Sequence, residues 1–285
     1  MEQTLRNQPA EESHLKINPG FSTAEEYPYL YPLDNLKIAA DSLELTIPQI
    51  PDYEFMNFGR LLQVVSSIGS CCLSHKLGLN GKYYFLGEKL RIRKRNYNNK
   101  GGPLTIKGNA ISTSKRKGKA LVDIFDEDNS LKYTLELDCN VFSEDTFNKL
   151  LKEHADDVIP GDFSSDLPSL YNTYIDEDQF TISIEGFSRE QCKGHFSGFP
   201  IVPAVFVSNC VLAGIEKWFR SSDNGITPLY VESLEIFANK AIPLNVQFKG
   251  ETSIIKLATK IFMFVSEIKD LSGNEYGYHI ITVQC

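Results

Sequence analysis

One histidine stands in a stretch whose neighbours would hold it rigidly. His195 belongs to the run 194–203, of sequence GHFSGFPIVP, in which two prolines restrict the backbone. Proline is favoured at the first position of a helix, so Pro203 is expected to start the apolar segment 204–219 that follows it. An imidazole titrates near physiological pH, and one held rigidly before a buried helix suits general acid–base chemistry on a bound substrate.

The same run resembles the signature of the hot-dog-fold 3-hydroxyacyl-thioester dehydratases. That signature reads roughly His-Phe-Pro-Gly-x-Pro-x-x-Pro-Gly and is followed by an apolar helix that carries an acidic residue. Ser197 replaces a proline of the signature, and Ala204 replaces its last glycine. The positions that match in register are His195, Phe196, Gly198, Pro200 and Pro203.

The order of the predicted elements occurs twice along the chain. In each copy a short strand of alternating polarity precedes a long apolar helix, Met56–Leu77 in the first and Pro203–Phe219 in the second. Strand-like stretches follow each helix, at 83–95, 102–114, 119–126 and 131–142, and again at 229–242, 245–252, 254–269 and 276–283. With the resemblance, this order implies an α+β double hot dog, in which two antiparallel sheets each wrap a long central helix.

The expected domain boundaries follow from this repeat. Residues 1–35 are polar and predict an N-terminal tail or strap, 36–154 the first hot dog, 155–170 a linker, and 171–285 the second hot dog. The helices align at an offset of 145, which pairs Gly59 with Ala204, whereas the preceding strands align at 137. The histidine loop lies in the extra residues, and Ile50 stands where His195 would fall in the first copy. A single active site is therefore expected.

The resemblance also implies roles for side chains. In the family, the histidine removes a proton alpha to the thioester carbonyl, a carboxylic acid from the partner's helix protonates the leaving hydroxyl, and backbone N–H groups polarise the thioester oxygen. The acid position is Asn209 here, and its equivalent in the first helix is Val64, beside Gln63, so none is a carboxylate. The expected catalytic residues are His195, Gln63 and Asn209, and the expected substrate-binding residues are Gly198, Pro203, Ala204, Val64 and Phe206.

Several activities remain open at this point. The main prediction is a dehydratase-like lyase for 3-hydroxyacyl thioesters of acyl carrier protein or CoA, in fatty-acid or polyketide-type biosynthesis. Asp52, Glu54 or Glu216 could supply a carboxylate from a shifted position, and Gln63 with His195 alone could support an unusual dehydratase or an enoyl isomerase. An acyl thioesterase, with Gln63 or Asn209 orienting water, is the alternative, and a non-catalytic acyl-binding or partner protein is another.

Charge is distributed unevenly in a chain of net charge −8. Arg91, Arg93 and Arg95 alternate on a predicted strand, which places three guanidinium groups on one face. The carrier-docking hypothesis is that this patch receives an acidic carrier protein or a phosphate group of the substrate, and the alternative is an ordinary solvated strand. Nucleic acid is excluded as a partner because the chain is acidic and lacks basic stretches interleaved with aromatic residues.

The remaining composition is that of an ordinary globular protein. The six cysteines show no CxxC spacing, which predicts free thiols in a reducing cytoplasm and no zinc site. The longest apolar runs are too short to cross a bilayer, and the first residues show no secretory signal. No cofactor or metal is expected. A thioester of acyl carrier protein or CoA is the expected partner, with a homodimer or a complex with other biosynthetic enzymes as the expected assembly.

Overall fold

The computed structural model describes residues 21, 23–30, 35–39, 42–48, 55–78, 81–96, 102–114, 116–155, 158, 160–176, 178–196, 198–221 and 228–285. For 55–57, 112–113 and 174–175 only the backbone is described. The elements are β1 (Lys37–Ile38), β2 (Ser42–Ile47), α1 (Phe55–Leu77), β3 (Tyr83–Lys94), β4 (Leu104–Thr113), β5 (Lys117–Phe125), β6 (Leu131–Ser143), α2 (Glu144–Leu150), a 3₁₀ turn (Lys152–His154), β7 (Leu170–Asp176), β8 (Gln179–Ile184), β9 (Ile201–Val202), α3 (Ala204–Ser221), β10 (Tyr230–Ala238), β11 (Ile242–Pro243), β12 (Phe248–Ala258), β13 (Ile261–Asp270) and β14 (Glu275–Gln284).

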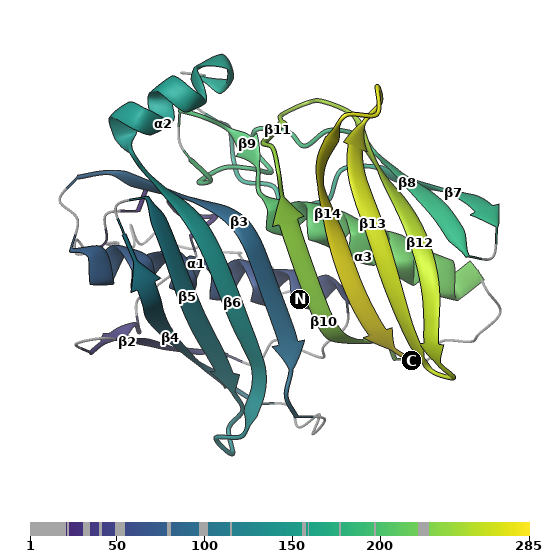
Figure 1. Ribbon diagram of the computed structural model, residues 1–285, viewed down its shortest axis with the longest axis horizontal. Helices are drawn as coiled ribbons and strands as arrows, with labels where there is room; N and C mark the ends of the chain where they lie inside the picture. Colours follow the sequence, from purple (N-terminus) through teal and green to yellow (C-terminus); the bar gives the residue numbers. More distant parts are fainter. Residues whose placement is uncertain are drawn as a thin grey trace, which may run out of the picture.

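One continuous antiparallel sheet runs through the described part of the chain (Figure 1). Its order is β1-β2-β4-β5-β6-β3-β10-β14-β13-β12-β8-β7, and β3 and β10 meet in the middle. The two expected sheets are therefore one. The physical reason is that an open strand edge carries unpaired backbone groups, and pairing β3 with β10 satisfies those of both strands.

The two sides of this seam follow the same topology. From the edge to the seam, β2, β4, β5, β6 and β3 correspond in sequence order to β8, β12, β13, β14 and β10. On each side the long helix follows the first of these strands, α1 after β2 and α3 after β8. The strands β2 and β8 begin 137 residues apart (179 − 42), the offset expected from the sequence.

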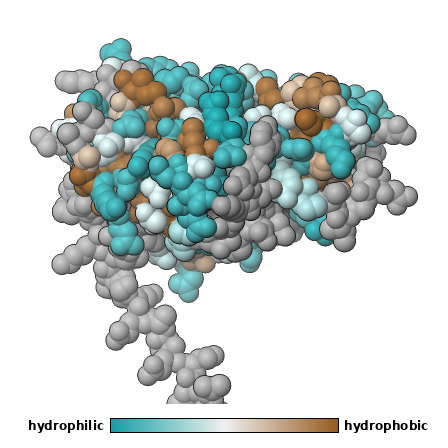
Figure 2. Space-filling view, turned by 90° about the horizontal axis from the view of Figure 1, so that it is seen from below, coloured by the Kyte–Doolittle hydropathy of each residue, from teal (hydrophilic) through white to brown (hydrophobic). Residues whose placement is uncertain are grey.

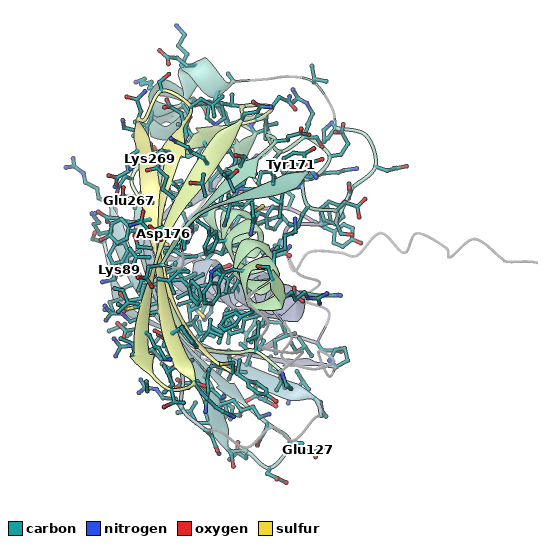
Figure 3. The ribbon with its side chains drawn as sticks, turned by 90° about the vertical axis from the view of Figure 1, so that its right-hand side faces the viewer. Lys89, Glu127, Tyr171, Asp176, Glu267 and Lys269 are labelled. Carbon is teal, nitrogen blue, oxygen red and sulfur yellow. The ribbon has the colours of Figure 1, made fainter. Side chains whose placement is uncertain are left out.

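Both long helices lie against the same face of the sheet, which curves around them (Figure 3). Helix α1 packs mainly on β4 and β5, and α3 packs on β7, β8 and β10. Apolar side chains of α1 are buried on nearly all sides, as expected of a helix in the centre of a core. The opposite face is charged, and Figure 3 shows Lys89, Glu267 and Lys269 on this outer side. The core therefore lies between the helices and the concave face of the sheet.

Three local features differ from the sequence-based expectations. Helix α3 starts at Ala204, so Pro203 is the residue before it, with its carbonyl accepting from the Phe206 N–H at 2.9 Å. The strand break expected near Ser253 lies instead at Thr259 and Lys260, which carry no glycine, proline or asparagine signal. Strand β7 begins at the end of the expected linker and was missed, because an edge strand with exposed residues has little hydrophobic alternation.

The surface of the described residues mixes polar and apolar groups. Seen from below, hydrophobic residues form separate patches among hydrophilic ones (Figure 2). Among the described residues, no helix combines the length and the apolar character that a bilayer crossing requires.

Candidate functional site

The loop that carries His195 orients the imidazole ring. The His195 N–H donates to the Cys192 carbonyl at 3.1 Å, and the ring Nδ1 lies 3.0 Å from the carbonyl oxygen of Ile201. A carbonyl can only accept, so the ring donates through Nδ1–H and Nε2 keeps its lone pair. The residue as a whole is 8% exposed. The arrangement presents a fixed nitrogen base from within the fold.

Aromatic packing fixes this loop against the first part of the chain. Phe196 has a φ of +56°, an unfavourable value for a bulky residue, and its ring is fully buried. That ring meets the edges of Tyr84 at 5.4 Å and Phe147 at 5.2 Å, and these two rings stack on each other at 3.8 Å. Tyr84 belongs to β3 and Phe147 to α2. The histidine loop is thus held in a strained conformation by elements from the other side of the seam.

An N-terminal segment crosses this region, and we call residues Thr23–Leu30 the strap. The Ala24 N–H donates to the Tyr83 carbonyl at 2.8 Å, next to a bridge between Thr23 and Tyr83. The Glu26 N–H donates to the Gly194 carbonyl at 2.8 Å. The strap is therefore tied by its backbone both to β3 and to the histidine loop.

One polar face of α1 completes the attachment of the strap. Gln63, Ser66 and Ser70 follow the i, i+3, i+7 spacing of a single helix face. Gln63 Nε2 donates to the Tyr29 carbonyl at 2.7 Å, Ser66 bonds to the Tyr29 hydroxyl, and Ser70 bonds to the Glu25 carboxyl. The Tyr29 ring lies 4.6 Å from that of His195. This helix face therefore sets the positions of two strap side chains beside the histidine.

Glu25 is the functional candidate that sequence reasoning missed. It was part of the expected tail, yet it is 6% exposed and its Oε2 has no hydrogen-bond partner among the described residues. An ionised carboxylate would be very costly in such a place, so the buried group is the neutral acid. The sequence did contain a signal, because the strap places apolar Tyr29 and Leu30 in an otherwise polar stretch.

These groups line a cavity of about 460 Å³. Its polar lining includes Glu25, Tyr29, Ser66, Ser70 and His195, and the apolar remainder comes largely from β3, β10 and the start of α3. A cavity of this size and character falls in the range of small-molecule sites. It lies along the β3–β10 seam and draws residues from both sides of it.

Burial moves the pKa values of the two titratable groups in opposite directions. It lowers the pKa of His195 to about 4, although the Ile201 carbonyl partly opposes this shift. It raises the pKa of Glu25 to about 8, although the hydrogen bond from Ser70 partly opposes that shift. At neutral pH the histidine is therefore a neutral base and the glutamic acid keeps its proton. Two titratable groups whose pKa values are shifted in opposite directions are typical of acid–base catalytic sites.

Glu25→Gln should stabilise the protein at neutral pH. Unfolded Glu25 ionises near pH 4.5 but the folded acid only near pH 8, so wild-type stability falls as pH rises through this window. The glutamine avoids the penalty, which is on the order of 2–4 kcal/mol at pH 7. Urea unfolding of both proteins between pH 4 and 8 measures the difference, which should grow with pH. If the difference in unfolding free energy between the two proteins did not change with pH, Glu25 would not be a buried neutral acid.

The structure separates the expected substrate-binding residues. Ala204 lines the cavity at the start of α3, and Pro203 precedes it. Val64 is buried in the core, Phe206 packs against the ring of Phe187 at 6.3 Å, and Gly198 is exposed. Ser197 lies outside the described residues. Of this set, Ala204 is the residue that the structure brings together with His195 in the cavity lining.

The amide candidates take structural positions. Gln63 supports the strap through the Tyr29 backbone and is one turn away from Ser66, which lines the cavity. Asn209 packs against α1, where a side chain added at Gly59 would come within 1.7 Å of its Oδ1. The position of the family acid is thus occupied by an amide at a tight helix crossing. It does not line the cavity that holds His195.

The alternative carboxylates do not reach the cavity in the described part of the chain. Glu216 lies on α3 and pairs with Arg220 one turn later. Asp52 and Glu54 lie outside the described residues. Glu25 on the strap and Glu88 on β3 both line the cavity that holds His195. The Glu88 side chain is 50% exposed and pairs with Lys117, so Glu25 is the buried carboxyl group of the two.

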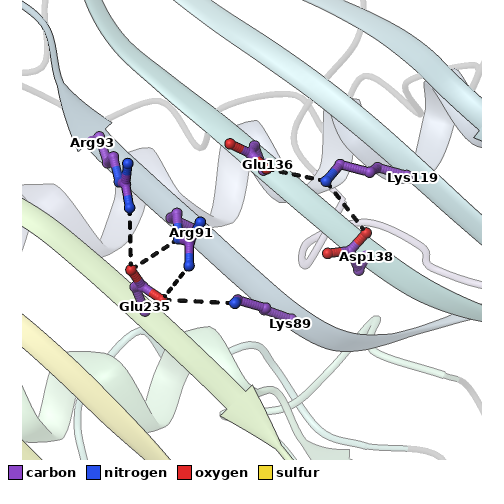
Figure 4. Close-up of polar contacts among 7 residues, drawn as sticks. All are labelled: Lys89, Arg91, Arg93, Lys119, Glu136, Asp138 and Glu235. Atoms are coloured by element: carbon purple, nitrogen blue, oxygen red, sulfur yellow. Dashed lines mark hydrogen bonds and ion pairs between the residues drawn. The ribbon is translucent and has the colours of Figure 1, made fainter.

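Arg91 and Arg93 lie at the seam between β3 and β10, where both approach Glu235 (Figure 4). Arg91 on β3 forms a two-point ion pair with Glu235 on β10, with atoms 2.8 and 2.9 Å apart. Arg93 lies 3.6 Å from the same carboxylate, and Arg95 donates to Thr134 at 3.3 Å. The charge of Arg91 is largely compensated by Glu235, and this ion pair connects the two sides of the sheet.

All six cysteines are free, and five of them are buried. Within the described ranges, no group of three or more metal-ligating side chains is clustered closely enough to hold an ion.

Comparison with known proteins identifies the fold. No family model and no curated sequence matches the chain. Among solved structures, a Lactobacillus plantarum protein assigned as an oleoyl thioesterase has a TM-score of 0.60, 9% identity, and coverage of 86% of this chain and 96% of its own. Acyl-CoA thioesterase II TesB2 from Mycobacterium marinum has a TM-score of 0.54, 7% identity, and coverage of 87% and 94%. An acyl-ACP thioesterase from Bacteroides thetaiotaomicron has a TM-score of 0.52, 9% identity, and coverage of 85% of this chain and 98% of its own.

These neighbours correct the main functional prediction. The expectation of a dehydratase-like lyase was wrong, because the three similar structures described above are all named as thioesterases. The geometry supplies a reason, since the family's acid position, Asn209, is an amide packed against Gly59 and away from the cavity. At identities below one tenth the likeness shows the fold alone. The chain has a hot-dog-type fold, with a large antiparallel sheet around its long helices.

Proposed function

We propose that the protein hydrolyses acyl thioesters, with acyl-CoA or acyl-ACP as the substrate. The observation that carries this proposal is the pairing of a neutral base, His195, with a protonated acid, Glu25, along one apolar cavity. Thioester hydrolysis needs a base to activate water, an acid for the leaving sulfur and an apolar site for the chain. The names of the solved structures with this fold support the same class of reaction.

We interpret the chain as two fused hot dogs that share this one site. Residues 36–154 form the first, residues 171–285 the second, residues 1–35 include the strap, and 155–170 link the two. The matching strand orders on the two sides of the seam support this interpretation. The second unit supplies the histidine loop, while the first supplies the helix face that holds the strap.

His195 is the proposed general base. Its Nδ1–H is engaged by Ile201, so Nε2 can accept a proton from water. Burial keeps the ring neutral at physiological pH, because its pKa is about 4. The ring of Phe196 stacks on the imidazole with centroids 4.1 Å apart, and the tilted ring of Tyr29 lies 4.6 Å away, so the two rings hold the imidazole in place. Such positioning lowers the barrier because the base does not need to reorganise during the reaction.

The start of α3 is the proposed site for the thioester oxygen. The first N–H groups of a helix have no partner within the helix and carry partial positive charge. Ala204 and Val205, the first two residues of α3, line the cavity, and Pro203 before them has no N–H of its own. Backbone donors there would stabilise the negative oxygen of a tetrahedral intermediate.

The proposed reaction has two steps. Water attacks the carbonyl carbon as His195 takes its proton, which gives a tetrahedral intermediate with a negative oxygen. The carbon–sulfur bond then breaks, and Glu25 gives its proton to the leaving sulfur. The products are a carboxylic acid and a free thiol. His195 then releases its proton and Glu25 regains one, so the enzyme returns to its starting state.

The test is incubation with acyl-CoA thioesters and mass spectrometry of the products. We expect equal amounts of free acid and free CoA. His195→Ala should lower kcat by about 10²–10⁴-fold, the usual contribution of a general base. Asn209→Ala is the matched control on the same half and should change kcat only a few-fold, because Asn209 does not line the cavity. Intact thioesters, or loss of water without release of thiol, would contradict the proposal.

A further inference from the structure

A single row of paired residues crosses most of the inner face of the sheet. Each member is the direct cross-strand partner of the next, from β4 at one side to β8 at the other. The row consists of Ala110, Ala120, Leu137, Leu90, Ile236, His279, Ser266, Thr252 and Phe180. The four residues in its middle, from Leu137 to His279, all line the cavity.

The two sides of the seam differ sharply along this row. On the first side, β6, β5 and β4 contribute Leu137, Ala120 and Ala110. At the corresponding strands of the second side, β14, β13 and β12 contribute His279, Ser266 and Thr252. The same topology is thus built once with an apolar row and once with a polar one. The fold itself does not require polar groups at these positions.

Two of the three polar residues satisfy each other. The hydroxyls of Thr252 and Ser266 are 2.7 Å apart and buried. His279 is 3% exposed, and neither of its ring nitrogens has a hydrogen-bond partner of normal geometry among the described residues. Burial lowers the pKa of this ring to about 4, and a contact with the Ala204 backbone opposes only part of that shift. Leaving a buried polar group without a hydrogen-bond partner destabilises the folded protein.

We propose that His279 binds a hydroxyl group carried on the acyl chain of the substrate. A neutral imidazole has one donor and one acceptor, and a hydroxyl group can serve as partner to either. The ring lines the same cavity as His195, so a bound chain can meet both. This inference rests on the proposed thioester hydrolysis and specifies its substrate class as hydroxylated acyl thioesters.

His279 is suited to recognition and not to proton transfer. In His195 one nitrogen is fixed by Ile201, which defines the other as the base. The ring of His279 has only a weaker contact with the Ala204 backbone, and no hydrogen bond of normal geometry fixes it. A ligand that supplies the missing hydrogen bond would bind more tightly than one of equal length that leaves the ring unpaired.

The test measures binding separately from turnover. Isothermal titration compares dodecanoic acid with hydroxydodecanoic acids that carry the hydroxyl at successive positions, and with the matching keto acids. The variant His279→Leu installs the residue type found at the corresponding position of the other side, Leu137. Wild type should prefer one hydroxy isomer over the plain acid by about 5- to 20-fold, and His279→Leu should lose this preference.

Ser266→Ala is the control, because this neighbour is polar and buried but is not part of the cavity lining. It should keep the preference. The proposal is overturned if wild type and His279→Leu share the same ratios, if no isomer is preferred, if no acid binds, or if a keto acid is preferred to every hydroxy acid. A retained binding preference without any thioester hydrolysis would overturn the proposed reaction while leaving the hydroxyl site intact.

Discussion

Glu25→Gln should lower kcat for thioester hydrolysis by about 10²–10⁴-fold and remove the alkaline limb of the pH profile. Wild-type activity should fall below about pH 4, where His195 becomes protonated, and above about pH 8, where Glu25 loses its proton. Glutamine keeps the shape of the side chain but cannot give up a proton to sulfur. The variant should therefore retain only the acidic limb. Steady-state kinetics between pH 4 and 9 measure both effects.

The adjacent residue provides the control for this experiment. Glu26 lies in the same strap, but its side chain is 49% exposed and lies 3.8 Å from Lys82. Glu26→Gln should leave both limbs of the profile in place, with kcat within a few-fold of wild type. An alkaline limb that persists in Glu25→Gln would show that another group titrates near pH 8 and that Glu25 is not the acid.

Gly194→Ala should reduce kcat/KM by about a hundredfold or more, because it separates the strap from the histidine loop. Gly194 has a φ of +86°, and an added Cβ would lie 2.3 Å from the Glu26 carbonyl oxygen. That contact is with backbone and cannot be relieved by a side-chain rotation. The strap would have to move away, and Glu25 and Tyr29 would move with it. Hydrolysis kinetics and thermal unfolding measure the loss.

Gly198 in the same loop is the matched control. Its φ is +85°, but no atom lies within 4 Å of an added Cβ. Gly198→Ala carries the backbone strain of a left-handed residue, about 1–2 kcal/mol, without the collision. Its activity should stay near wild type while its melting temperature falls. Equal losses of activity in the two variants would mean that loop strain, and not strap displacement, determines the rate.

Periodicity and motif spacing predicted much of the fold. Helix α1 was expected at Met56–Leu77 and is found at Phe55–Leu77, because its apolar residues and final glycine mark it clearly. The hairpin turn at Thr259 and Lys260 was misplaced, because neither residue marks a turn. Pairing of β3 with β10 could not be predicted, since local patterns do not show which strand edges meet.

The candidate site was only half visible in the sequence. His195 could be found because its loop has a fixed spacing of prolines and glycines. Glu25 lies 170 residues earlier (195 − 25) in a segment whose composition is that of a tail, and only tertiary packing buries it. The helix position that carries the acid in the family holds Asn209 in this chain. A carboxylate that reaches a site from outside the repeated unit leaves no trace in an alignment of the two copies.

The β3–β10 seam has a consequence for the cooperativity of unfolding. Five residue pairs join these strands, and ion pairs from Arg91 to Glu235 and from Lys94 to Glu232 cross the same line. Freeing either half would expose two strand edges and leave charged partners unmatched at the same moment. We expect calorimetry to show one unfolding transition with no intermediate. A ligand bound in the cavity along the seam should raise the midpoint temperature of this one transition without splitting it. The reason is that both halves would lose the ligand together.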